Sequence, residues 1–111
     1  STPALPLQGC YLIHWEQPYK SGRHPGARHY VGYSDDIDRR LETHRQGHGS
    51  PLVAAALAVG IEIRVVRIWP GADRHFERKL HNRHGSRLCP DLECRSEQRR
   101  HQLQARLPLD C

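Results

Sequence analysis

Residues 9–15 read GCYLIHW, a run of mostly apolar and aromatic side chains that begins at a glycine. Such a run is rich in residues that favour an extended backbone, and it predicts a strand. Alternate side chains of a strand share a face, so residues 10, 12 and 14 are expected on one face and residues 11, 13 and 15 on the other. The segments on the C-terminal side are predicted relative to this strand.

A turn-rich segment follows. Residues 16–27 contain two prolines and two glycines, and these residues predict a loop because they interrupt regular pairing. Residues 28–33, RHYVGY, predict a second strand. Two strands joined by one loop suggest an antiparallel pair.

Two helices are predicted next. Residues 34–36, SDD, offer side-chain oxygens that can cap the free N–H groups of a first turn, and Ile37 and Leu41 mark the core-facing side of that helix. The helix is expected to end near the glycines at 47 and 49. Ser50-Pro51 begins the second helix, whose residues 52–59 are nearly all apolar and therefore expected to be buried.

Residues 61–69 are rich in β-branched side chains and predict a third strand, which Pro70-Gly71 terminates. Asp73 is expected to cap a helix that reaches about His84. From Asp91 the chain is charged and is predicted to be helical to about Arg106. The order β-β-α-α-β-α plus a C-terminal helix predicts an α+β fold, with a small three-stranded antiparallel sheet flanked by helices.

One domain is expected at a length of 111 residues. The predicted organisation is a tail at 1–8, a domain at 9–90 and a helical extension at 91–111. A membrane protein is excluded, because the longest apolar run, residues 52–61, is too short to cross a bilayer. The start of the chain lacks the features of a secretory leader, and the four irregularly spaced cysteines suggest reduced thiols. These features predict a cytoplasmic protein.

The formal net charge is +5, and Lys20 and Lys79 are the only lysines among 17 Lys and Arg residues. An arginine-rich surface attracts polyanions, because the planar guanidinium can donate two hydrogen bonds to one phosphate. The alternative, a solvated basic surface without a partner, fits the composition equally well.

Seven residues form a pattern with a specific order and spacing. Arg40 and His44 lie four positions apart and share a helix face. The full pattern is Gly9 and Tyr11 on the first strand, Tyr30 and Gly32 on the second, then Arg40, His44 and, on a later helix, Glu77. Over residues 9–84 this pattern resembles the GIY-YIG endonuclease family. The resemblance implies DNA phosphodiester hydrolysis with one divalent cation, Mg²⁺ or Mn²⁺, and structural roles for the two glycines.

The resemblance also implies the role of each residue. Tyr11 would act as the general base on the attacking water, and Tyr30 would orient the water or the scissile phosphate. Arg40 would stabilise the transition state, and His44 would relay a proton or donate to phosphate. Glu77 would bind the metal ion. Each of these residues also has a structural alternative. Tyr11 and Tyr30 could be ordinary strand aromatics, and His44 could only cap or pack. Arg40 could pair with Asp36, and Glu77 with His81.

DNA is the predicted partner, bound by a monomer or a homodimer, and a non-catalytic nucleic-acid-binding module on the same fold is the alternative. The candidate DNA-binding residues are basic or aromatic and flank the predicted site in sequence: Lys20, Arg23, Arg28, Tyr33, Arg39, Arg45, Arg74 and Arg78.

A second cluster in sequence could bind zinc. His81 and His84 lie three positions apart, and Cys89 and Cys94 follow closely. The alternative is that the histidines face solvent and the thiols are partly buried.

Overall fold

The computed structural model describes residues 5–21, 25–83, 85–96 and 99. It has an α+β fold, as predicted, built on a three-stranded sheet of order β2-β1-β3 in which both neighbouring pairs are antiparallel. The strands are β1 (Gly9–Lys20), β2 (Pro25–Ser34) and β3 (Ile63–Pro70).

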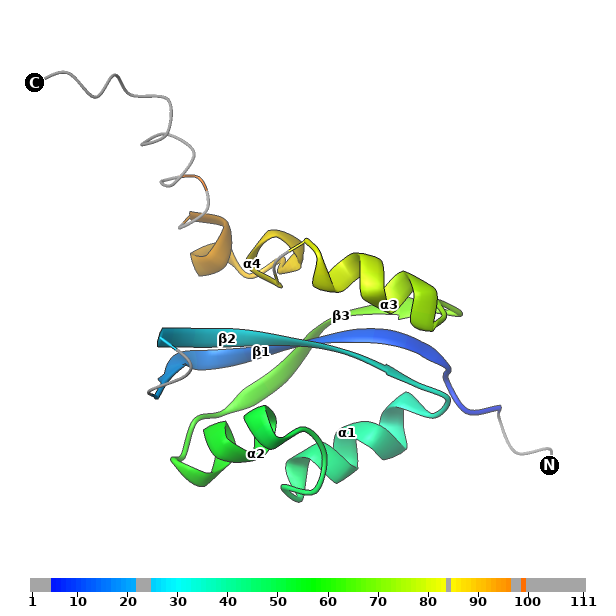
Figure 1. The fold of residues 1–111 in the computed structure, drawn as a ribbon, viewed down its shortest axis with the longest axis horizontal. Coiled ribbons are helices and arrows are strands. Elements are labelled where there is room, and N and C mark those ends of the chain that lie inside the picture. Colours follow the sequence, from blue (N-terminus) through cyan, green and yellow to red (C-terminus); the bar gives the residue numbers. More distant parts are fainter. Residues whose placement is uncertain (1–4, 22–24, 84, 97–98, 100–111) are drawn as a thin grey trace, which may run out of the picture.

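Helices cover both faces of the sheet (Figure 1). One face carries α1 (Ile37–Arg45) and α2 (Pro51–Ala58), and the other carries α3 (Arg74–His81) and α4 (Gly85–Leu88). Strand β1 is central, so residues 10–15 are buried on both faces. Tyr11, Ile13 and Trp15 pack on the α1–α2 side, and Cys10 and Leu12 pack in the cluster on the other side. The alternation predicted for this strand is confirmed.

The predicted loop over residues 16–27 is wrong, because β1 continues to Lys20 and β2 begins at Pro25. The pairing register shifts between His14 and Tyr19. Such an irregular stretch tolerates Pro18, which has no N–H to donate to a neighbouring strand. The connection between the strands is therefore short, and most of the expected loop belongs to the two paired strands.

Strand β3 begins at Ile63 rather than Ile61, and a bulge interrupts its pairing with β1 opposite Leu12 and Ile13. A bulge adds one residue to a strand and thereby changes which side chains face each way. Ile63 and Val65 consequently pack on the α1–α2 side, whereas Val66 packs with the opposite cluster.

The predicted helix starts are confirmed by their caps. Asp36, Ser50 and Asp73 accept hydrogen bonds from the backbone N–H groups of the first turns of α1, α2 and α3. Helix α3 ends at His81, before the predicted His84. The expectation that residues 52–59 are buried is only partly right. Val53 and Ala56 are the buried residues of α2, and Val59, just beyond it, is 65% exposed.

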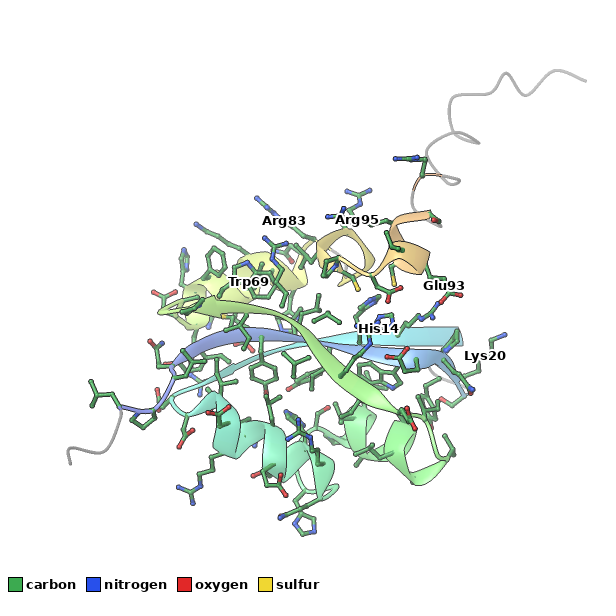
Figure 2. All side chains as sticks on the ribbon, turned by 180° about the vertical axis from the view of Figure 1, so that it is seen from behind. His14, Lys20, Trp69, Arg83, Glu93 and Arg95 are labelled. Atoms are coloured by element: carbon green, nitrogen blue, oxygen red, sulfur yellow. The ribbon has the colours of Figure 1, made fainter. Side chains whose placement is uncertain are left out.

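Residues 92–96 are helical and most of the predicted C-terminal helix lies outside the described residues. Cys94, in the predicted C-terminal extension, is buried in the same cluster as Cys10 and Leu12. Figure 2 shows Arg83 and Arg95 on the outer side of the layer formed by α3 and α4. None of the helices in the described part of the chain is long and apolar enough to span a membrane.

Candidate active site and metal centre

A pocket of about 520 Å³ opens where β2 ends and α1 and α3 begin. Tyr30 reaches it from β2, Arg40 from α1 and Glu77 from the first turn of α3. The remaining lining residues come from the same three regions: Tyr33, Ser34, Asp35, Asp36, Arg39, Thr43 and Arg74. The fold therefore gathers three of the five predicted catalytic residues on one polar surface.

The other two predicted residues form a buried pair beside this pocket. The Tyr11 hydroxyl lies 2.7 Å from Nε2 of His44, and both side chains are fully buried. The backbone N–H of Ser50 donates to Nδ1 of His44 over 3.3 Å. A neutral imidazole has one N–H, so that hydrogen is on Nε2 and is donated to the Tyr11 hydroxyl oxygen.

Glycines make room for this pair. A Cβ atom at Gly32 would collide with the Tyr11 hydroxyl and would lie 2.9 Å from Cε1 of Tyr30. A Cβ atom at Gly49 would collide with the His44 ring. At Gly9 the φ angle is 153° and a side chain would meet the Trp69 carbonyl, so this position also requires glycine.

Burial and neighbouring charges shift the pKa values of Tyr11 and His44. Burial raises the pKa of Tyr11 to about 12, and the charges of Tyr30 and Glu77 act in the same direction, whereas interaction with the Arg40 guanidinium lowers it. Burial, and then the charge of Arg40, lowers the pKa of His44 to about 4. At neutral pH the pair is therefore a protonated phenol and a neutral imidazole.

Glu77 both lines the pocket and contacts His81. Its Oε2 lies 3.7 Å from Nε2 of His81, the alternative partner considered from the sequence. Its side chain is 20% exposed. A carboxylate in this position can ligate a hydrated divalent cation such as Mg²⁺, which keeps several water ligands.

Several candidate DNA-binding residues lie at or near the pocket. Tyr33, Arg39 and Arg74 line it, and the Arg74 guanidinium stacks over the Tyr33 ring at 4.8 Å. Arg45 and Arg78 do not line the pocket. Arg45 lies 3.7 Å from Glu42 on the surface of α1, and Arg78 is exposed on α3.

The structure does not bring the remaining candidates to the pocket. Lys20 lies at the hairpin end of the sheet, opposite the end that carries Ser34 (Figure 2). Arg28 donates to the Trp15 carbonyl and, over 2.8 Å, to Glu93, so its guanidinium holds the C-terminal segment against β1. Arg23 lies outside the described residues.

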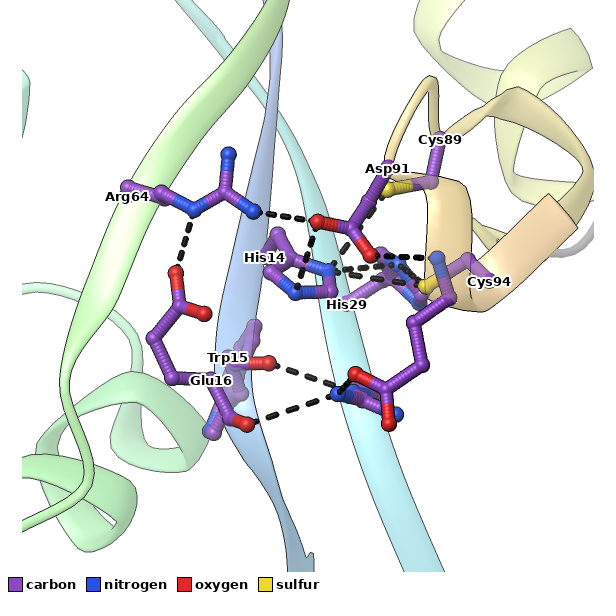
Figure 3. A network of polar contacts seen from close by, with 10 residues as sticks. His14, Trp15, Glu16, His29, Arg64, Cys89, Asp91 and Cys94 are labelled. Atoms are coloured by element: carbon purple, nitrogen blue, oxygen red, sulfur yellow. Dashed lines mark hydrogen bonds and ion pairs between the residues drawn. The ribbon is translucent and has the colours of Figure 1, made fainter. Parts of the chain in front are cut away.

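A second group of four side chains converges on the face of β1 and β2 that carries α3 and α4 (Figure 3). Ligand atoms of His14, His29, Cys89 and Cys94 all lie within 4.8 Å of one another, so the group can hold a metal ion. Burial lowers the pKa of both histidines, that of His29 to about 4, so both rings are neutral. A neutral imidazole is the form that ligates metals.

The zinc cluster considered as one possibility from the sequence is thus corrected in its histidines. His81 is exposed beside Glu77 and away from the cysteines, and His84 lies outside the described residues. Cys89 and Cys94 instead meet two histidines of the sheet. A signal for this was present, because the antiparallel register that pairs Tyr11 with Gly32 also pairs His14 with His29.

No known family model matches the chain, and comparisons with curated proteins and with solved structures found no match.

The low pKa of His44 predicts a pH-dependent stability. Between about pH 6.5 and 4 the unfolded chain binds a proton at this histidine that the folded chain does not, so stability falls as the pH is lowered through that range. The loss is up to about 3 kcal/mol. Urea unfolding at pH 7 and pH 5 should show a smaller loss in His44→Gln than in wild type or in His48→Gln, an exposed control. Equal losses in all three would contradict the prediction.

Proposed function

We propose that the chain is a metal-dependent endonuclease that hydrolyses DNA phosphodiester bonds at the pocket between β2, α1 and α3. The supporting observation is that Tyr30, Arg40 and Glu77 line this pocket while the Tyr11 hydroxyl, bonded to His44, lies against them. A carboxylate among cations suits hydrolysis better than binding, because a phosphate-binding surface has no use for it. The proposal agrees with the resemblance to the GIY-YIG family.

Each residue has a distinct task in the proposed reaction. Arg40 donates to the non-bridging phosphate oxygens, where negative charge grows in the transition state. Tyr30 positions the attacking water, and the phenolate form of Tyr11 accepts the water's proton. Because burial raises the pKa of Tyr11 to about 12, the hydroxyl must first release its own proton to solvent. The Nε2–H of His44 and the Arg40 guanidinium both stabilise that phenolate, and they oppose the effect of burial without cancelling it.

Glu77 would hold the divalent cation, Mg²⁺ or Mn²⁺, since both metals prefer carboxylate and water ligands. When bound there, the cation supplies positive charge to the departing 3′-oxygen and to the scissile phosphate. Tyr33, Arg39 and Arg74 would contact the flanking phosphates from the rim of the pocket.

Glu77→Gln tests the proposal, because it keeps the shape of the side chain and removes the charge. We expect wild type to nick supercoiled plasmid with Mg²⁺ or Mn²⁺ and not without added metal. The Glu77→Gln protein should be at least about 100-fold slower. The control is Glu42→Gln, which removes an exposed carboxylate from α1 outside the pocket and should retain full activity. Equal cleavage by Glu77→Gln and wild type would refute the proposed role.

The ion pair between Glu77 and His81 favours the second candidate, a non-catalytic nucleic-acid-binding module, because it gives the carboxylate a structural partner. In that case wild type would bind DNA, with affinity falling as salt rises, yet cleave nothing with either metal. Binding and cleavage are both measured on labelled single-stranded and duplex DNA, and binding without cleavage of either form identifies the second candidate.

A further inference from the structure

Four distances within the second cluster describe a coordination sphere. Nδ1 of His14 lies 3.2 Å from Nε2 of His29, 3.5 Å from Sγ of Cys89 and 3.7 Å from Sγ of Cys94. Sγ of Cys94 lies 3.5 Å from Nε2 of His29. For a tetrahedral zinc ion with ordinary Zn–N and Zn–S bonds, ligand separations are about 3.3 Å between nitrogens and about 3.6 Å between nitrogen and sulfur. These four separations match such a sphere, and all six separations among the ligand atoms are within 4.8 Å.

Hydrogen bonding alone does not account for this arrangement. A ring nitrogen has one hydrogen or one lone pair, yet Nδ1 of His14 faces three polar atoms at once. The other nitrogen of His14, Nε2, is buried without a hydrogen-bond partner among the described residues. It lies 3.9 Å from the Asp91 carboxylate, which Arg64 also contacts. A carboxylate behind a metal-binding histidine is the usual way to orient the ring.

We propose that His14, His29, Cys89 and Cys94 bind one structural Zn²⁺ ion. Two thiolates and two imidazoles in a tetrahedron select zinc over Mg²⁺ or Mn²⁺, which prefer oxygen ligands. His14, Cys89 and Cys94 are at most 2% exposed. Four protein ligands and this burial leave no position for substrate, so the site is structural and separate from the pocket at Glu77.

The site joins segments that are distant in sequence. Cys89 and Cys94 follow α4, 75 and 80 residues after His14 on β1. At Gly85, which begins α4, a side chain would collide with Cβ of His29, so the glycine allows α4 to approach β2 closely. Zinc would fasten α4 and residues 89–94 to the sheet next to the core cluster that contains Cys10 and Leu12.

The test is metal analysis of the full chain purified without chelator. We expect about one zinc per chain and, after exchange with Co²⁺, the d–d bands of tetrahedral cobalt together with thiolate-to-cobalt charge-transfer absorption. Zinc should also protect Cys89 and Cys94 from alkylation. Cys94→Ser should reduce the zinc content at least about tenfold, and Cys10→Ser, a buried cysteine outside the cluster, should retain it.

If Cys94→Ser does not fold, metal binding by wild type alone tests the proposal. A chain that binds neither zinc nor cobalt on reconstitution, or one whose Cys89 and Cys94 form a disulfide without metal, would overturn the proposal. Equal zinc loss in Cys10→Ser and Cys94→Ser would also overturn it. The outcome is independent of nuclease activity, because Glu77→Gln should keep its zinc whether or not wild type cleaves DNA.

Discussion

Arg40→Ala is expected to lower the rate of DNA cleavage by about 10²–10³-fold while the fold is retained. The side chain lines the pocket, so its loss removes the donor aimed at the phosphate oxygens. The same change removes the cation that lowers the pKa of Tyr11, so this pKa should rise further and deprotonation should become harder. The measurement is single-turnover cleavage of labelled DNA at saturating protein.

Arg39→Ala is the matched control for this prediction. Arg39 precedes Arg40 on α1, is exposed and also lines the pocket, but the arginine that lowers the pKa of Tyr11 is Arg40. Its loss should weaken DNA binding several-fold and leave the saturated rate near that of wild type. If the two alanine variants slow the saturated rate equally, the special role of Arg40 is wrong.

Removal of zinc is expected to lower the midpoint of thermal unfolding by at least about 10 °C. The free energy of binding to a structural zinc site is part of the free energy of folding. Without the ion, the ring nitrogens and thiols of the cluster have only one another as partners, and Nε2 of His14 is buried without a hydrogen-bond partner among the described residues. Circular dichroism of zinc-loaded and chelated protein measures the shift.

Cys94→Ser provides the control for chelation. The variant lacks the site, so its unfolding midpoint should be low in the presence of zinc and should not change when a chelator is added. An unchanged midpoint of the wild type after complete zinc removal would contradict a structural role for the ion.

The two proposed metal sites differ in their ligands, and this affects how inhibition by a chelator is interpreted. A chelator would remove zinc from the sulfur and nitrogen ligands as well as a divalent cation from Glu77, so lost cleavage alone would not identify the catalytic metal. If Mg²⁺ restores cleavage in protein that has kept its zinc, Mg²⁺ is the catalytic metal, because the two proposed sites differ in ligand chemistry.

Local sequence features predicted the elements well. The alternation in residues 9–15 and the caps at Asp36, Ser50 and Asp73 depend on neighbouring residues, and they were confirmed. The length of the hairpin and the bulge in β3 depend on pairing between strands, which local patterns do not specify.

The two candidate sites also differ in how far the sequence predicts them. The pocket residues follow an ordered pattern along the chain, and the structure brings Tyr30, Arg40 and Glu77 to one surface. Proximity to the cysteines in sequence favours the histidines at 81 and 84 as members of the second cluster. The histidines that meet the cysteines come instead from β1 and β2, because the register of the sheet and the packing of residues 89–94 create that proximity.

The most direct test of the proposed hydrolysis is the chemistry of the ends left in nicked plasmid. Departure of the 3′-oxygen leaves a 3′-hydroxyl and a 5′-phosphate, which DNA ligase can reseal. We predict that nicks made by wild type with Mg²⁺ are resealed completely and that Glu77→Gln, purified in parallel, makes almost none. The absence of nicks with wild type, or the same nicks with Glu77→Gln, would contradict the assignment of this pocket as a nuclease site.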